Sequence, residues 1–517
     1  MKENPKKFLE ELKTEKAKPF ESEDRELGTA LGHITSIAKE FKLDHFPTQF
    51  DVVPPHTMYT IGSYGLPNRF SHWSHGRDYW KMKTSYDHGL SKIYEVVINS
   101  DPSQAYLLEN NAPIENKVVM AHVLGHTDFF KNNYLFKPTR KDMPEAAALH
   151  AKRINEYEYR EGKEVVERVL DAALAIEEHI DPHRPERPYR DDELQQWKDK
   201  SKRRGDDKKE VFPPEPDKDI LGIIRNHAPY LEDWERDAVD IVRKESLYFY
   251  PQMRTKLMNE GWASYWHLKI MREMSKREFV TAAEDEHFIH MHAGVVAPNP
   301  QQINPYYMGL KMFEYIEDHH NGKLTEKENK WLKENGQTVY PKYKGDFKQS
   351  PGLQKVREVM EENDDQSFIR NYFNKITADR MGMYIYEEEE LSSGTIVYIK
   401  EKGWMEIRDK LVQSMDNNGN PYIVCTDIDY EKKQELYLKH QYEGQELEKQ
   451  YVEKTLPYVQ SLWRKPVHLE TQTEERGRAV YTYDGKAIKT VYEKQPPKPP
   501  SSQYVFGPYG MPIKRNP

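Results

Sequence analysis

Two histidines four residues apart offer the clearest chemistry in this chain. His122 and His126 lie in the segment Met-Ala-His-Val-Leu-Gly-His-Thr-Asp-Phe-Phe, whose apolar residues predict a buried helix over 115–131. On a helix this spacing puts both imidazoles on one face, one turn apart, as in sites that hold a metal ion. The alternative is a pair of hydrogen-bonded core histidines, which fits the same spacing.

A second segment places a carboxylate among aromatic residues. It reads Met-Asn-Glu-Gly-Trp-Ala-Ser-Tyr-Trp-His, and it contains Glu260 and His267. Seven residues are two helical turns, so both side chains share a face. A buried carboxylate is costly unless it is paired or binds a metal ion. Glu260 is therefore either half of an ion pair within the core or a third metal ligand.

The run Glu-Gly-Trp-Ala over 260–263 resembles one that some gluzincin metallopeptidases carry at their third ligand. This resemblance implies a site held by His122, His126 and Glu260 with an open fourth position, which is the catalytic type of site. Zinc is the expected divalent metal. Zincin helices carry a Glu as general base directly after the first His, and here that position is Val123.

Another residue would have to replace the missing base. The candidates are Asp128, His267 and His292, the last of which closes the run Glu-Asp-Glu-His-Phe-Ile-His-Met-His over 284–292. Among the three histidines of this run, which could bind a metal ion or transfer protons, we favour His292 because it precedes the turn at Gly294 and an extended, proline-containing loop. A polar helix end is the alternative explanation for this histidine-rich run.

Composition limits the classes of function. For 517 residues we expect two or more domains, and the net charge of -9 argues against nucleic-acid binding. The single cysteine, Cys425, excludes an internal disulfide and a CxxC zinc ribbon. No apolar segment is long enough for a secretory signal or a membrane span, so we expect a cytoplasmic protein.

The order of predicted elements indicates an α+β protein of two domains. Residues 1–390 are expected to form a mainly helical domain, with an irregular aromatic region over 44–92 and a polar, flexible insertion over 181–219. Residues 394–492 read as β-α-β-β-α-β, the order of a ferredoxin-like domain, which is usually a binding or assembly module. The proline-rich segment 493–517 is expected to be a disordered tail.

Taken together, the motifs resemble the SpoVR family, the stage V sporulation protein R group. The resemblance covers about residues 20–490. The segments that carry it, in chain order, are His-Val-Leu-Gly-His-Thr-Asp-Phe-Phe-Lys-Asn-Asn (122–133), Tyr-Phe-Tyr-Pro-Gln (248–252), Thr-Lys-Leu-Met-Asn-Glu-Gly-Trp-Ala (255–263), His-Ala-Gly (292–294) and Asn-Pro-Tyr-Tyr-Met-Gly (304–309).

The resemblance implies a cytoplasmic bacterial protein that takes part in sporulation, in particular in spore cortex formation, with relatives that act in stress responses. It also implies a functional partner, a serine protein kinase or another sporulation or stress protein. It gives a process and not a reaction.

Two hypotheses follow. In the first, a zincin-like core is a metal-dependent hydrolase that acts on an amide bond. In the second, the core has lost catalysis and serves as a scaffold, while the C-terminal domain docks a partner such as the kinase. Val123 favours the scaffold, and the buried Glu260 and its neighbouring histidines favour the hydrolase.

Overall fold

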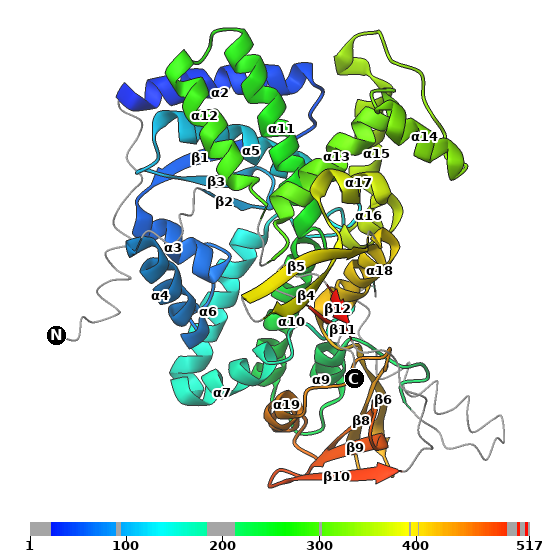
Figure 1. Ribbon diagram of the computed structural model, residues 1–517. Coiled ribbons are helices and arrows are strands. Elements are labelled where there is room, and N and C mark those ends of the chain that lie inside the picture. The colour runs from blue at the N-terminus through cyan, green and yellow to red at the C-terminus, as the bar shows by residue number, and fades with distance from the viewer. Residues whose placement is uncertain are drawn as a thin grey trace, which may run out of the picture.

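The computed structural model describes residues 22–88, 95–183, 212–298, 302–391, 394–401, 403–493, 504–506 and 512–514. Helices make up most of these residues, and a separate sheet lies near the C-terminal end (Figure 1). The chain is thus a mainly helical α+β protein, as predicted. Most of the segments 181–219 and 493–517 lies outside the described residues, so the expected insertion and tail stay predictions.

A small sheet opens the helical part. It consists of β1 (Thr48–Val53), β2 (Glu95–Ile98) and β3 (Ser103–Leu108), in the order β1-β3-β2. β1 runs parallel to β3, and β2 runs antiparallel to it as an edge strand. Two helices, α3 (Pro55–Tyr64) and α4 (Trp73–Asp87), lie between β1 and β2. The prediction of an irregular region over 44–92 was therefore wrong.

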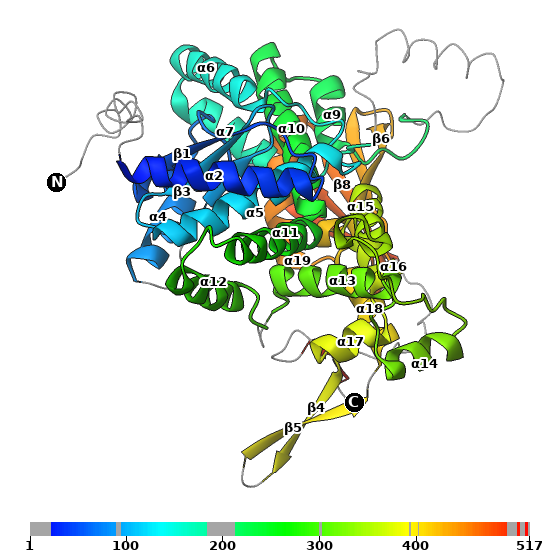
Figure 2. The ribbon, with the colours of Figure 1, turned by 90° about the horizontal axis from the view of Figure 1, so that it is seen from above.

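A layer of long helices packs beside this sheet. It contains α2 (Ser22–Glu40), α5 (Pro113–Asn132), α11 (Lys256–Lys276) and α13 (Pro305–His320), which lie side by side (Figure 2). α5 and α11 are buried along most of their length, and their apolar side chains belong to one core cluster. α5 confirms the helix that the sequence predicts over 115–131.

The remaining helices surround this layer and extend it toward the C-terminal sheet. They are α6 (Met143–Glu161), α7 (Lys163–Leu174), α9 (Ile220–His227), α10 (Asp233–Arg254), α12 (Ala282–Val295), α14 (Glu326–Glu334), η1 (Phe347–Gln349), α15 (Pro351–Glu362), α16 (Asp365–Tyr372) and α17 (Lys375–Met381).

Glycines allow the central helices to approach closely. A Cβ atom on Gly125 of α5 would lie 2.7 Å from the Cα atom of Ala263 in α11. A Cβ atom on Gly261 would lie 2.5 Å from Gly309 of α13. Larger residues at these positions would push the helices apart. The glycines thus set the distance between the helices that carry the candidate ligands.

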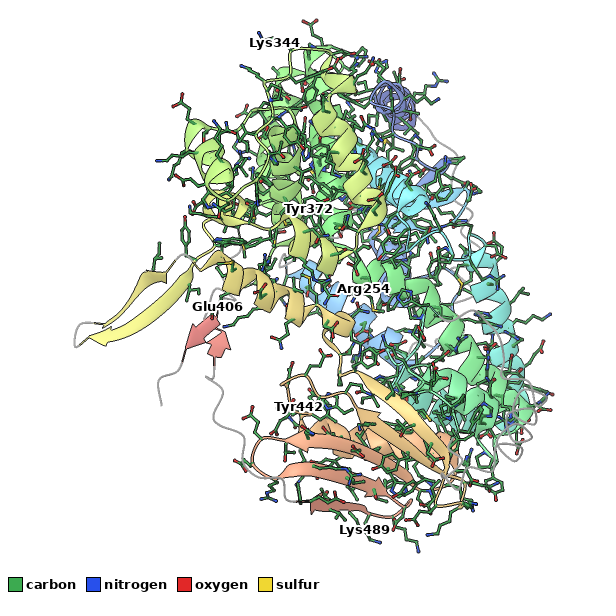
Figure 3. The ribbon with its side chains drawn as sticks, turned by 90° about the vertical axis from the view of Figure 1, so that its right-hand side faces the viewer. Arg254, Lys344, Tyr372, Glu406, Tyr442 and Lys489 are labelled. Carbon is green, nitrogen blue, oxygen red and sulfur yellow. The ribbon has the colours of Figure 1, made fainter. Side chains whose placement is uncertain are left out.

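The C-terminal sheet has five strands. They are β6 (Ile423–Tyr430), β7 (Glu435–His440), β8 (Val467–Thr473), β9 (Gly477–Tyr483) and β10 (Ile488–Glu493), in the order β10-β9-β8-β7-β6. Only β7 and β8 are parallel, and α19 (Lys449–Trp463) connects them. In Figure 3 the sheet lies below the helical part, with Tyr442 at its upper edge and Lys489 at its lower edge.

This topology differs from the expected ferredoxin-like order. The strand predicted over 395–400 lies in β5 (Gly394–Glu401), which pairs with β4 (Ile385–Leu391) in a separate hairpin that projects from the body (Figure 2). The next helix, α18 (Trp404–Ser414), packs on α16. Its buried residues Ile407 and Leu411 belong to the helical core. Alternating apolar residues identify a strand, but they do not specify its partner.

The sheet shares a core with the helical part. Its buried side chains form one cluster with those of α7, α9 and α10. The chain also contains a short antiparallel pair, β11 (Tyr504–Phe506) and β12 (Pro512–Lys514). Among the described residues, no helix combines the length and the apolar character that a membrane span requires.

Candidate metal centre

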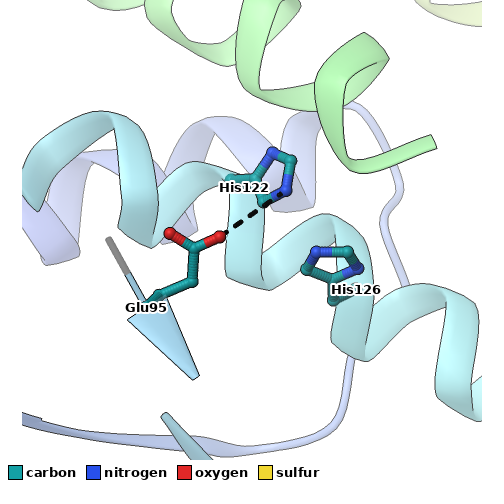
Figure 4. Close-up of side chains that lie close together, drawn as sticks. All are labelled: Glu95, His122 and His126. Carbon is teal, nitrogen blue, oxygen red and sulfur yellow. Dashed lines mark ion pairs between the residues drawn. The ribbon is translucent and has the colours of Figure 1, made fainter. Parts of the chain in front are cut away.

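The predicted ligands come from two helices and meet a third element. α5 carries His122 and His126, and α11 carries Glu260. The edge strand β2 adds Glu95, whose carboxylate points toward His122 (Figure 4). Ligand atoms of Glu95, His122 and His126 lie within 4.8 Å of one another.

The distances between the donor atoms suit a single metal ion. Oε2 of Glu260 lies 3.5 Å from Nε2 of His122 and 3.5 Å from Nε2 of His126. Oε1 of Glu95 lies 3.9 Å from Nε2 of His122. In a tetrahedral site with zinc bonds of 2.0–2.1 Å, neighbouring donors are about 3.3 Å apart. The donor set therefore has the chemistry and nearly the spacing of a zinc site.

The hydrogen bonds of the histidines leave their inner nitrogen atoms free. Nδ1 of His126 lies 2.9 Å from Oδ1 of Asn259, and this amide oxygen can only accept. His126 therefore carries its proton on Nδ1 and turns a lone pair on Nε2 toward Glu260. Nε2 of His122 and Oε2 of Glu260 are both buried without a hydrogen-bond partner. A cation between these atoms would satisfy all three.

A chain of imidazoles runs outward from His122. Nδ1 of His122 lies 2.9 Å from Nδ1 of His267, and Nε2 of His267 lies 2.7 Å from Nδ1 of His292. If Nε2 of His122 binds a metal ion, its Nδ1 must carry the proton and donate to His267. His267 then donates from Nε2 to His292. The chain would thus fix the tautomer and orientation of the ligand.

Burial keeps these imidazoles in the form that binds metals. It lowers the pKa of His126 and that of His292 to about 4, and it lowers the pKa of His267 well below its ordinary value. All three are therefore neutral near pH 7. Of the three, only His126 is a candidate ligand, and because metal ions bind neutral imidazole it is in the form that binds a cation.

The two carboxylates differ in their electrostatics. Burial acts to raise the pKa of Glu260, but its contacts with His122 and His126 outweigh this effect and lower the pKa. Burial also raises the pKa of Glu95, and the nearby charge of Glu260 adds to the increase. Glu260 thus suits a ligand, whereas Glu95 has the greater tendency to hold a proton.

The site opens into a cavity of about 540 Å³. Glu95, Glu260, His267 and His292 all line it. Tyr306, near the start of α13, also lines the cavity. Burial and the adjacent carboxylates raise the pKa of Tyr306, so its hydroxyl stays protonated. A ligand in this cavity would meet both carboxylates and a hydroxyl donor.

Asp128 lies outside this cavity. Its Oδ2 accepts a hydrogen bond of 2.9 Å from Nε1 of Trp262, and its Oδ1 accepts one of 2.6 Å from the backbone of Asp44. It is not among the lining residues. Its contacts join α5 to α11 and to the segment that precedes β1.

Sequence reasoning brought together the histidines and Glu260 but did not select Glu95, Asn259 or Tyr306. For Glu95 a signal existed, because it is a lone carboxylate in the apolar strand sequence Ile-Tyr-Glu-Val-Val-Ile. Asn259 and Tyr306 lie in two of the segments that carry the family resemblance, but these segments alone assign neither residue a role, because both act through contacts between helices.

Comparison with known proteins identifies the family. Residues 21–420 match the family described as SpoVR like protein, and residues 421–474 match the SpoVR-like C-terminal domain. The chain belongs to the SpoVR family, and this membership indicates a sporulation-related protein.

A curated relative comes from Escherichia coli (strain K12), where it is named uncharacterized protein YcgB. It is 32% identical over 485 residues, which cover 87% of this chain and 92% of the relative. No solved structure matches.

Proposed function

We propose that this protein is a metal-dependent hydrolase that cleaves an amide bond during spore cortex formation. The supporting observation is the convergence of three free donor atoms, those of His122, His126 and Glu260, beside an open cavity. A bound divalent metal, with zinc as the expected ion, would lower the pKa of water and polarise a carbonyl group.

The chain's own residues would supply the remaining steps. Glu95 stands beside the ligands with a raised pKa, and we assign it the role of proton acceptor in place of the base missing at Val123. Tyr306 would donate its hydroxyl hydrogen bond to negative charge that develops on the carbonyl oxygen. His267 would hold the ring of His122, and His292 would hold that of His267.

Lys256 supports a substrate that carries negative charge. It is exposed, it lines the cavity, and it precedes Glu260 by one helical turn. Among the described residues, no carboxylate forms an ion pair with it. An amide substrate that carries a carboxylate would therefore find a counter-charge at the mouth of the cavity. A cytoplasmic peptide precursor of the cortex is a substrate of this kind.

The position of Glu95 favours the alternative, a scaffold that docks a partner such as a serine protein kinase, because its ligand atom lies within 4.8 Å of those of His122 and His126. If Glu95 bound the metal as a fourth protein ligand, the site would be closed, as structural zinc sites are. The metal would then stabilise the fold without catalysis.

A Glu95→Gln variant distinguishes the hydrolase proposal from the scaffold alternative. We would load the protein with zinc and measure amine release from N-acetylated dipeptides with a free C-terminal carboxylate. The hydrolase proposal predicts that Glu95→Gln keeps its zinc and loses at least 100-fold in rate. Loss of zinc from this variant, or no metal-dependent hydrolysis by the wild type, would favour the scaffold.

A further inference from the structure

A second cavity, of about 640 Å³, lies where the helical part meets the C-terminal sheet. Its walls come from the turn after α7, from α9, from the segment around η2 (Asp416–Gly419), from the adjoining ends of β6 and β7, and from α19. Both family domains contribute, since the boundary between them falls at residue 420. Ligand pockets often form at such junctions. The candidate metal centre contributes no residue to it.

The interior of this cavity is apolar. Buried aliphatic side chains from both domains form it, namely Ile176, Ile220, Leu438, Leu456, Val459 and Leu469. Such a surface favours a hydrocarbon group over water.

One buried polar group in the wall lacks a partner. His179 is 9% exposed, and its Nδ1 is buried without a hydrogen bond. Burial lowers the pKa of this imidazole to about 4, so the ring is neutral at pH 7. Buried polar atoms are normally satisfied, and a ligand with a hydrogen-bonding group would satisfy this one.

The mouth of the cavity is acidic. Four carboxylates line it, those of Asp416, Glu443, Glu446 and Glu448. The lining residues that the structure describes include no lysine or arginine. Two tyrosine rings in the lining already face cations: Tyr422 faces Nζ of Lys218 at 5.0 Å, and Tyr451, which is 61% exposed, faces Nζ of Lys454 at 5.9 Å. The carboxylates of the mouth attract cations and disfavour anions.

We propose that this cavity binds an organic ammonium ion with an apolar body. The hydrocarbon part fills the aliphatic interior, and the ammonium group lies where it can donate a hydrogen bond to Nδ1 of His179 and face the carboxylates of the mouth. Binding would stabilise the packing of the two family domains, because both form the walls. This site is independent of the candidate metal centre.

The full-length protein allows a direct test by isothermal titration calorimetry at pH 7. The probe is n-octylammonium, compared with octanoate and 1-octanol, which keep the chain but change its head group. We expect one binding site for n-octylammonium and at least tenfold weaker binding of the other two. Equal or tighter binding of octanoate or octanol, or no binding of n-octylammonium, would overturn the proposal.

Variants locate the binding. Thr455→Trp fills the cavity from α19, and the double variant Glu443→Gln, Glu446→Gln removes charge from the mouth. Each is expected to weaken binding at least tenfold. The control is Glu453→Gln, which removes an exposed carboxylate of α19 outside the lining and should change nothing. Unchanged binding in the double variant would contradict the assignment, even if Thr455→Trp failed to fold.

Discussion

Oε2 of Glu260 lies 3.5 Å from Nε2 of His122, and neither atom has a hydrogen-bond partner although both are buried. This distance is too long for a good hydrogen bond and close to the separation of two ligands on one metal ion. The helices that carry the two residues approach closely where Gly125 meets Ala263. The geometry of the site therefore depends on helix packing as much as on the ligands.

The imidazole chain gives a prediction about metal affinity. Replacing His267 by Phe removes the hydrogen-bond partner of Nδ1 of His122. Without this hydrogen bond, the ring of His122 is no longer held in the orientation that binds a metal ion through Nε2. We expect the affinity for zinc to fall about 10- to 100-fold, as measured by competition with a chromophoric chelator. His290→Phe is the control, because His290 is exposed on α12 and does not line the cavity. Equal zinc affinities in the two variants would show that the imidazole chain does not support His122 as a ligand.

Asp128 offers a test of a structural role against a catalytic one. In Asp128→Asn the amide can accept only one of the two hydrogen bonds, from Trp262 or from Asp44. Urea unfolding should show a loss of about 1–3 kcal/mol of stability, because a buried donor is left unpaired. The zinc content should stay the same. An unchanged stability with lost hydrolysis would instead assign Asp128 to catalysis.

The crossing of α11 and α13 predicts a steric effect. A methyl group on Gly261 would meet the backbone of Gly309 at 2.5 Å. Gly261→Ala should therefore destabilise the protein by about 2–3 kcal/mol in urea unfolding. Gly28→Ala is the matched control, because that glycine lies in α2 with open space around it. Equal stabilities of the two variants would mean that the helices can separate without cost.

The C-terminal sheet contains an ion network with a defined pH dependence. Burial acts to raise the pKa of Glu470, but hydrogen bonds from Arg478 and Tyr437 outweigh it and lower the pKa to about 2. A depressed carboxyl pKa stabilises the folded state above the ordinary value of 4.5, and this contribution is lost as the pH falls from 4.5 toward 2.

Glu470→Gln should therefore be less stable than the wild type at pH 6, by about 1 kcal/mol because the group is partly solvated. The difference should shrink as the pH falls toward 3. Urea unfolding at several pH values measures it, with the exposed Glu475→Gln as control. A difference that stays constant with pH would contradict the network.

Local patterns were sufficient for some parts of the fold and not for others. The spacing of His122 and His126 and the apolar run around them identified α5, because helix periodicity is encoded within the segment. The same logic found the helix that carries Glu260. The strand over 395–400 was also found, but it was assigned to the wrong sheet. Strand pairing depends on distant residues, and alternation alone leaves the partner undetermined.

In the candidate site, too, local patterns predicted some residues, whereas others depend on contacts between distant segments. Glu260 was selected because a carboxylate in an aromatic helix needs an explanation. Glu95 was missed, since its proximity to His122 arises only when β2 becomes the edge strand beside α5. The sequence predicts an irregular aromatic region over 44–92, yet α3 and α4 form there. Pro54 and Gly65 lie at the two ends of α3, where they delimit the helix.

Elemental mass spectrometry of purified protein tests the central claim most directly. The samples are the wild type, Glu260→Ala and the exposed control Glu286→Ala, each incubated with zinc and dialysed. We predict about one equivalent of zinc in the wild type and the control, and less than about a tenth in a folded Glu260→Ala. No zinc in any sample, or equal zinc in all three, would contradict a metal centre at His122, His126 and Glu260.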